Sequence, residues 1–111
     1  MKREGAIAFG EIAVDFDRME LRRSGQLIPA SVLEFRLLKF FVDNPEYVFS
    51  RSDLIRAVWP ERKRVNNRSV DNIISRLRRK IEDDPARPAY FRTYYGAGYK
   101  FLPSGLRKKR L

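Results

Sequence analysis

The stretch of sequence that decides the fold is Asn67-Arg-Ser-Val-Asp-Asn-Ile-Ile-Ser-Arg-Leu-Arg-Arg-Lys-Ile-Glu82. Its apolar residues recur at the i, i+3, i+4, i+7 spacing that gives an α-helix one face to pack on a core. At about 100° per residue, the opposite face is basic and rich in hydrogen-bond donors. The apolar face consists of Val70, Ile73, Ile74, Leu77 and Ile81, and the basic face consists of Arg68, Asn72, Ser75, Arg76 and Arg79.

The basic face has two interpretations. A solvated outer face is the simpler one, because charge runs often serve only solubility. Solvated faces usually mix charge signs, however, whereas here Arg78 and Lys80 add positive charge at the edges and Asp71 is a single acid against them. Such a face repels itself unless an anion covers it, and arginine forks match both phosphate oxygens and the acceptor pair of guanine. We therefore interpret the stretch as a recognition helix for the DNA major groove.

The overall composition agrees with an anionic partner. The chain has 111 residues, enough for one domain with a core, and its 24 Lys and Arg against 14 Asp and Glu give a net charge of +10. Between Arg51 and Lys80 there are ten basic residues and three acidic ones, so seven of the ten net charges lie in this segment. The imbalance favours nucleic acid as the partner, and an anionic membrane surface second.

The chain contains neither Cys nor His. This excludes disulfides and zinc fingers and removes the commonest general base, so we expect no metal site, no cofactor and no enzymatic activity. The sequence has no run of about 18 apolar residues and no signal peptide. We therefore expect no membrane contact from this segment and a cytoplasmic, nucleoid-associated protein.

Two shorter helices and a small sheet are predicted before the basic helix. Residues 9–28 alternate apolar and polar side chains around turns, which predicts an antiparallel sheet with a structural role. Ser31 and Glu34 form a capping box that starts the first helix, and a weaker box starts the second helix at Ser50, which Pro60 closes. Two short helices followed by a longer one are typical of a helix-turn-helix variant.

A β-hairpin is predicted after the basic helix. Residues 90–102 are rich in aromatic residues around a Gly-containing turn. The Gly96-Ala-Gly98 pattern is weak as a phosphate loop, because a strand follows it instead of a helix. The preceding Asp83-Asp84 pair lacks further spaced ligands, which indicates a solvated turn. We expect Phe91, Tyr99 and Phe101 to anchor the hairpin, with Arg92, Tyr94, Tyr95 and Lys100 at its surface.

In this order and spacing, the chain resembles the OmpR/PhoB type of winged-helix effector domain found in bacterial response regulators. The residues that carry the resemblance are Glu34-Phe35 with Leu37-Leu38, Phe49-Ser50-Arg51 with Leu54 and Val58-Trp59, Arg68-Ser69-Val70-Asp71 with Ile74, Leu77-Arg78 and Lys80, and Thr93 with Gly96, Gly98-Tyr99 and Phe101. The resemblance implies an α+β fold, a winged helix-turn-helix with a four-stranded antiparallel N-terminal sheet, three helices and a C-terminal β-hairpin wing. This domain would span residues 9–102, between an N-terminal extension (1–8) and a basic tail (103–111).

The resemblance also implies a function and its residues. The domain would bind double-stranded DNA sequence-specifically, usually at direct repeats, as a monomer that dimerises on DNA. The third helix would enter the major groove and the wing would lie near the minor groove. Base contacts would come from Asn72, Ser75, Arg76 and Arg79, and backbone contacts from Arg51, Trp59, Arg68, Arg78, Thr93 and Tyr99, with Arg92, Tyr95 and Lys100 in the wing. The loop of Glu61, Arg62, Lys63, Arg64 and Val65 resembles one that contacts RNA polymerase in transcription-activating family members.

One departure from the family and two alternative functions stay open at this point. Many family members carry Arg in the wing before its first Gly, whereas this chain has Tyr95, which cannot act as a cation in a narrow, electronegative groove. The charge also allows an RNA-binding module, with Tyr94 and Tyr95 for stacking on bases, or a protein-interaction module. The sequence does not decide whether a phosphoacceptor domain or a membrane span belongs to the full protein.

Overall fold

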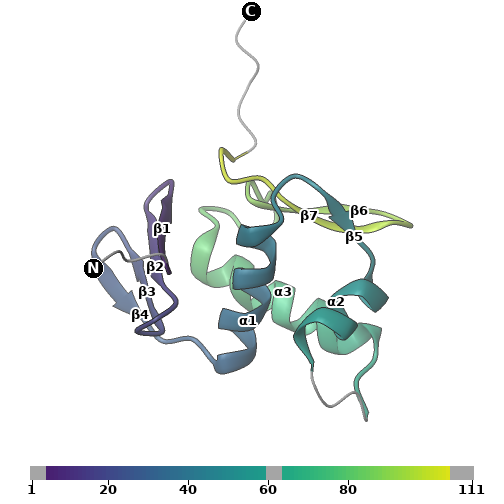
Figure 1. The fold of residues 1–111 in the computed structure, drawn as a ribbon. Helices are drawn as coiled ribbons and strands as arrows, with labels where there is room; N and C mark the ends of the chain where they lie inside the picture. The colour runs from purple at the N-terminus through teal and green to yellow at the C-terminus, as the bar shows by residue number, and fades with distance from the viewer. Residues whose placement is uncertain (1–4, 60–63, 106–111) are drawn as a thin grey trace, which may run out of the picture.

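The computed structural model describes residues 5–59 and 64–105, which form three helices and two sheets (Figure 1). Helices α1 and α3 stand between the N-terminal sheet on the left of the view and the C-terminal sheet on the right. This confirms the predicted α+β winged helix. The elements are β1 (Ala6–Phe9), β2 (Ile12–Asp15), β3 (Glu20–Arg23), β4 (Gln26–Ile28), α1 (Val32–Asp43), β5 (Val48–Phe49), α2 (Arg51–Val58), α3 (Asn67–Ile81), β6 (Phe91–Tyr94) and β7 (Gly98–Phe101).

The N-terminal sheet begins earlier than predicted. Its four strands are antiparallel in the order β1-β2-β3-β4, and β1 starts at Ala6, not at Phe9. A turn with Gly10 at φ 56° folds β1 back so that Ala6 pairs with Asp15 and Phe9 with Ile12. The sequence signal was weak because two of the four residues of β1 are alanines, which give little apolar alternation.

The last strand of this sheet has two neighbouring apolar residues on opposite faces. Leu27 pairs with Arg22 and is 57% exposed, whereas Ile28 pairs with the buried Leu21. Because successive strand residues point to opposite faces, Ile28 and not Leu27 lies on the core side. The core-facing residues of the sheet come from all four strands and pack towards the helices.

Capping boxes start all three helices. At α1, the Ser31 hydroxyl accepts from the Glu34 amide at 3.1 Å and the Glu34 carboxylate accepts from the Ser31 amide at 3.0 Å. The predicted box at Ser50 is formed in the same way. At α3, Asn66 and Ser69 form a third box that was not predicted, because Ser does not match the Glu or Gln of the usual pattern. These caps satisfy amides that a helix start leaves without partners.

The apolar stripe of α3 lies at the centre of the core. All five residues predicted for it are buried, with exposures from 0% to 4%. The three aromatic anchors predicted for the hairpin are also buried. Helix α1 contributes the other large share of the core, with Phe35, Leu37, Leu38 and Phe41.

The C-terminal sheet has one strand more than the predicted hairpin. Its order is β5-β7-β6, and Phe49 of β5 pairs with Tyr99 of β7. Strand β5 has only two residues, too few to show a period in the sequence. Gly98 has φ 138°, and a Cβ there would lie 1.9 Å from the Phe49 carbonyl oxygen. The second glycine is therefore required for the close approach of β5 and not for a phosphate loop.

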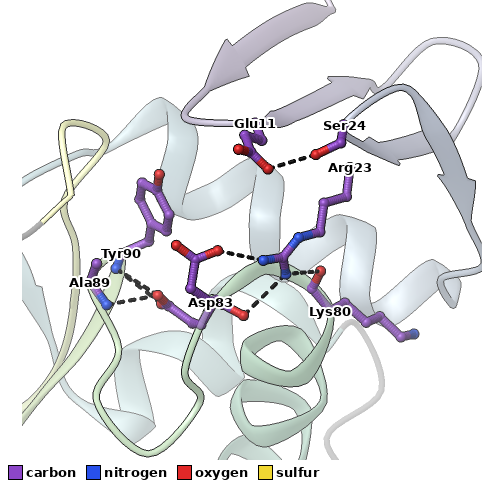
Figure 2. Close-up of polar contacts among 8 residues, drawn as sticks. Glu11, Arg23, Ser24, Lys80, Asp83, Ala89 and Tyr90 are labelled. Atoms are coloured by element: carbon purple, nitrogen blue, oxygen red, sulfur yellow. Dashed lines mark hydrogen bonds and ion pairs between the residues drawn. The ribbon is translucent and has the colours of Figure 1, made fainter.

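An arginine from the N-terminal sheet caps the C-terminal end of α3 (Figure 2). The Arg23 guanidinium donates to the carbonyl oxygens of Lys80 at 3.3 Å and Glu82 at 3.1 Å, and it pairs with the Asp83 carboxylate at 2.5 Å. A cation is favourable at this helix end, where carbonyl groups lack intrahelical partners. Asp83 lies in the solvated turn that the sequence predicted, with its side chain 96% exposed, and it also forms this ion pair.

A buried carboxylate joins the same helix end to the wing. Glu82 is 2% exposed, and its side chain accepts hydrogen bonds from the amides of Ala89 at 2.7 Å and Tyr90 at 3.0 Å (Figure 2). It also accepts one from the amide of Phe91 at 2.8 Å. Bonds of this kind to an ionised acceptor are stronger than neutral ones. Glu82 therefore fixes where β6 starts relative to α3.

We predict that Glu82→Ala destabilises the domain by about 2–4 kcal/mol, because it leaves three backbone amides without their acceptor. Urea unfolding of the variant and the parent chain measures this difference. The control is Asp43→Ala, which removes an exposed carboxylate paired with Lys39 at 2.7 Å and should cost about 0.5 kcal/mol or less. Equal losses in the two variants would contradict a special role for Glu82.

Candidate nucleic-acid interface

The outward face of α3 carries the basic side chains that the helical periodicity placed there. Arg68, Asn72, Arg76 and Arg79 are exposed, and Ser75 is half-buried. Arg79 donates to the Ser75 hydroxyl at 3.0 Å. Within residues 5–59 and 64–105, neither Arg68 nor Arg76 has an ion-pair partner. The guanidinium groups of these two residues are thus available for an anion.

The two cations expected at the edges of this face bind their own chain. Lys80 pairs at 2.5 Å with Glu34, whose side chain is 3% exposed. Arg78 donates to the Phe91 carbonyl oxygen at 2.7 Å and to the Thr93 hydroxyl at 2.7 Å. Burial lowers the pKa of the Arg78 guanidinium from its ordinary value. The exposed basic face is therefore narrower than the sequence implied, and its edges tie α3 to α1 and to the hairpin.

A polar hollow of about 560 Å³ lies beside the basic face. Its walls come from the first turn of α2, one side of α3 from Asn67 to Arg78, and the hairpin. The α2 start contributes backbone amides and the partial positive charge of a helix N-terminus, which favour an anion nearby. Residues that line the hollow include Arg51, Asn67, Asp71, Arg78, Thr93 and Tyr99.

One carboxylate links the three walls of the hollow. Asp71 Oδ1 accepts a hydrogen bond from Arg51 Nε at 2.8 Å and another from the Tyr99 hydroxyl at 2.6 Å. The Tyr99 ring in turn lies 5.6 Å from the Arg78 guanidinium, in cation–π contact. Side chains from α2, α3 and β7 thus form one connected network.

The pKa shifts of this network follow from its contacts. Partial burial alone would raise the pKa of Asp71, but the hydrogen bonds from Arg51 and Tyr99 outweigh it and lower that pKa. Burial, followed by the bond to Asp71, raises the pKa of Tyr99. The bond to Asp71 also raises the pKa of Arg51. At neutral pH the network therefore holds an ionised Asp71, a neutral Tyr99 and a charged Arg51.

The hairpin tip presents aromatic and basic side chains to solvent. Tyr95 is 94% exposed and Tyr94 is 37% exposed. Lys100 Nζ lies 4.9 Å from the centre of the Tyr94 ring, and Arg92 is half-buried on the neighbouring strand. The predicted wing residues Arg92 and Lys100 therefore pair with each other across the hairpin, whereas Tyr95 lies in the turn at its tip.

Some predicted contact residues have little free surface. Trp59 ends α2 and is 8% exposed, and Tyr99 is 6% exposed with its hydroxyl bonded to Asp71. Of the loop predicted to contact RNA polymerase, Arg64 is exposed and Val65 packs against the core. The other three residues of that loop lie outside the described part of the chain, as does most of the basic tail.

The structure also brings into the site two residues whose role there was not predicted. Asp71 is one of the residues that carry the resemblance to the OmpR/PhoB type. From the sequence, however, it is only a single acid beside the basic face. Its partners lie 20 and 28 residues away in the chain, so no local spacing signals the network. Asn67, in the first turn of α3, lines the same hollow.

The described residues hold no group of three or more acidic side chains arranged to bind a metal ion. In the same part of the chain, none of the helices has the length and apolar character needed to cross a membrane.

Comparison with known proteins identifies the family. The family model described as "Transcriptional regulatory protein, C terminal" matches residues 25–101, which include α1, α2, α3 and the hairpin. The chain belongs to this family. An uncharacterized transcriptional regulatory protein, YcbL of Bacillus subtilis, is 35% identical over 94 residues, which cover 85% of this chain and 42% of YcbL. The probable transcriptional regulator ycf27 of Porphyra purpurea is 37% identical over 100 residues, which cover 87% of this chain and 41% of ycf27. The chain thus spans about two fifths of the length of these relatives.

Solved structures agree with this family assignment. The response regulator DrrB of Thermotoga maritima, an OmpR/PhoB homologue, superposes with a TM-score of 0.80 at 36% identity, covering 88% of this chain and 44% of DrrB. The RstA DNA-binding domain of Klebsiella pneumoniae, solved in complex with the RstA box, superposes with a TM-score of 0.76 at 28% identity, covering 88% of this chain and 97% of that domain. The resemblance to the OmpR/PhoB type is therefore confirmed.

We predict that Asp71 of this family member titrates below the ordinary Asp value of about 3.9, and that Arg51→Met raises its pKa. Because the folded-state pKa is lowered, the network contributes stability at neutral pH and loses it as the pH falls through that pKa. The carboxyl-carbon NMR shift of Asp71 as a function of pH measures both values. An Asp71 titration that Arg51→Met leaves unchanged would contradict the network.

Proposed function

We propose that this chain is the sequence-specific DNA-binding domain of a bacterial transcription regulator of the response-regulator type. It binds double-stranded DNA with α3 in the major groove and the hairpin near the minor groove. It acts in the cytoplasm, at the nucleoid, and carries out no enzymatic reaction. Family membership and the likeness to RstA, which was solved bound to its DNA box, support this proposal.

The observation that carries the proposal is the outward face of α3. It presents Arg68 and Arg76 as exposed cations with no ion-pair partner in the described part of the chain. Its apolar stripe is fully engaged in the core, so the helix cannot rotate these side chains away. A rigid helix with a basic, hydrogen-bonding outer face fits the width of the major groove.

The exposed side chains divide into two roles. Base edges are read by Asn72, Ser75, Arg76 and Arg79, because guanidinium and amide groups pair with the acceptors and donors of guanine and adenine. Arg68 lies at the start of α3 and, with Arg51 at the start of α2, grips the phosphate backbone. Phosphate contacts position the protein, and base contacts select the sequence.

The other residues predicted to contact the DNA backbone are partly buried or already bonded within the protein. Arg78 donates a hydrogen bond to the Thr93 hydroxyl. These two residues therefore contact a phosphate only through atoms that this hydrogen bond does not engage. Tyr99 contributes mainly by holding Asp71, since its hydroxyl is already engaged. The burial of Trp59 leaves it only a small exposed edge for a backbone contact.

Assembly on DNA follows the same proposal. Two copies bind direct repeats as a dimer, while the isolated domain is a monomer. In the predicted polymerase loop, the exposed Arg64 is the described residue best placed to meet a protein partner.

Selection of sites from a random duplex pool tests the function. We expect a repeated half-site to be enriched, with a large ratio of affinities for the selected duplex over a scrambled one and a steep loss of affinity with salt. Structured RNA should compete poorly against the selected duplex. No enrichment, with all duplexes and RNA bound alike, would contradict sequence-specific DNA binding. If the domain instead bound a protein, and high salt did not weaken that binding, the result would favour a protein-interaction module.

We predict different outcomes for two arginines of α3. Arg76→Ala should reduce the affinity ratio between selected and scrambled duplexes by about 1–3 kcal/mol, because one base contact is lost. Arg68→Ala should weaken both duplexes alike and lower the salt slope by about one unit. Fluorescence anisotropy with each duplex at several salt concentrations measures both quantities.

Arg36→Ala is the matched control for these variants. Arg36 is exposed on α1, so the variant has the same charge change outside the proposed interface. It should leave the affinity ratio unchanged. If Arg68→Ala and Arg76→Ala both lost specific and scrambled binding equally, the division of roles would be wrong.

A further prediction concerns the wing. Tyr95→Arg should strengthen binding to duplexes with an A/T-rich segment under the wing and steepen the salt dependence, because a cation is attracted into a narrow minor groove. Tyr95→Phe, which keeps the ring, should show neither effect. Affinities for two duplexes that differ only in that segment provide the test. An A/T preference already present in the parent chain and lost in Tyr95→Phe would overturn this view of the wing.

A further inference from the structure

Asp71 is an acidic side chain within a surface that we propose faces DNA. It lies on α3 between the basic Arg68 and Arg76, and a carboxylate at such a place repels phosphate. Its pair with Arg51 is also partly exposed, with side-chain exposures of 44% for Arg51 and 39% for Asp71. Exposed pairs contribute little to stability, so stability alone gives weak reason for an acid here.

The geometry of the pair gives Asp71 a different use. The Nε of Arg51 bonds to Asp71, and the guanidinium also interacts with Tyr99, which bonds to the same carboxylate. A guanidinium has its donors in a fixed fork, so holding the Nε side orients the two terminal nitrogens. The Arg51 side chain is 44% exposed, so the part of the fork that faces away from Asp71 can bind a phosphate.

The carboxylate itself is held from a second direction. The Tyr99 hydroxyl donates to the same Oδ1 at 2.6 Å, and Tyr99 is buried in β7 beneath the Arg78 guanidinium. Asp71 is thereby fixed between α3 and the wing. An arginine bonded to a fixed acceptor loses less side-chain freedom when it binds its ligand than a freely moving one.

We propose that Asp71 is a positioning residue, which orients Arg51 for a DNA phosphate at the start of α2. This inference rests on the proposed DNA-binding function. According to this inference, the Asp71 carboxylate favours the binding of a DNA phosphate, although both groups are negatively charged.

The direction in which Asp71→Ala changes DNA affinity distinguishes charge repulsion from positioning. Charge repulsion alone predicts that Asp71→Ala tightens DNA binding, because it removes a negative charge. Positioning predicts the opposite: Asp71→Ala should weaken binding roughly threefold to tenfold for selected and scrambled duplexes alike, since Arg51 is no longer held. Asp71→Asn keeps an oxygen acceptor of similar shape and should recover part of the loss.

The same substitution in an Arg51→Met background provides the matched control. Without the guanidinium there is nothing to position, so Asp71→Ala should tighten binding there by removing repulsion. Affinities of the parent chain, both single variants and the double variant for the two duplexes complete this cycle, and thermal unfolding checks the fold of each. Tightening by Asp71→Ala in the parent background would overturn the inference.

Two further variants keep the test decisive. Should Asp71→Ala unfold, Tyr99→Phe carries the test, because it removes only the hydroxyl that fixes Asp71. It should weaken duplex binding severalfold, and unchanged affinity would then count against positioning. Arg51→Lys keeps the charge without the fork, and it should bind as weakly as Arg51→Met if orientation matters. A parent chain that fails to bind any duplex would instead contradict the proposed function itself.

Discussion

The packing of α3 into the core is the constraint on which the rest of the structure depends. Its apolar stripe is buried in the core and packs against α1 and α2, so the rotation of the helix about its axis is fixed. Fixing the rotation also fixes which side chains face outward. A single helix thus supplies both the largest continuous part of the core and the basic surface, and substitutions in the stripe would disturb both.

Polar contacts at the edges of α3 hold it against its neighbours. Lys80 bonds to Glu34 of α1, and Arg78 bonds to β6 of the hairpin. At the C-terminal end, Arg23 from the N-terminal sheet and the Glu82 carboxylate join the helix to both sheets (Figure 2). The wing is therefore placed relative to α3 by buried hydrogen bonds, which makes the two elements a single rigid surface for a ligand.

Several parts of this arrangement could be predicted from the sequence, because local rules decide them. Helical periodicity correctly separated the two faces of α3, and the capping boxes at Ser31 and Ser50 marked two helix starts. The aromatic-rich segments on both sides of the Gly-containing turn indicated a hairpin with buried aromatic anchors. The family resemblance supplied the four-stranded sheet, which the residues alone predicted only in outline.

Other parts could not be predicted, because they depend on residues distant in the chain. From the sequence, Arg78 and Lys80 lie at the edges of the basic face, but nothing in it shows that they bond to partners on the hairpin and α1. Asp71 gains its role only when α2 and β7 fold beside α3. Burial and pairing of charges require the tertiary structure, which is why the sequence predicted the exposed face of α3 but not the network that joins it to α2 and β7.

In the proposed complex, the outward face of α3 contacts duplex DNA together with the start of α2 and the hairpin tip. Backbone amide NMR shifts of the domain, titrated with its selected duplex, test this arrangement residue by residue. We expect the largest changes at residues 67–79, 50–52 and 93–97, with the N-terminal sheet unaffected. Changes concentrated on the N-terminal sheet or on α1, with the exposed residues of α3 unchanged, would contradict it.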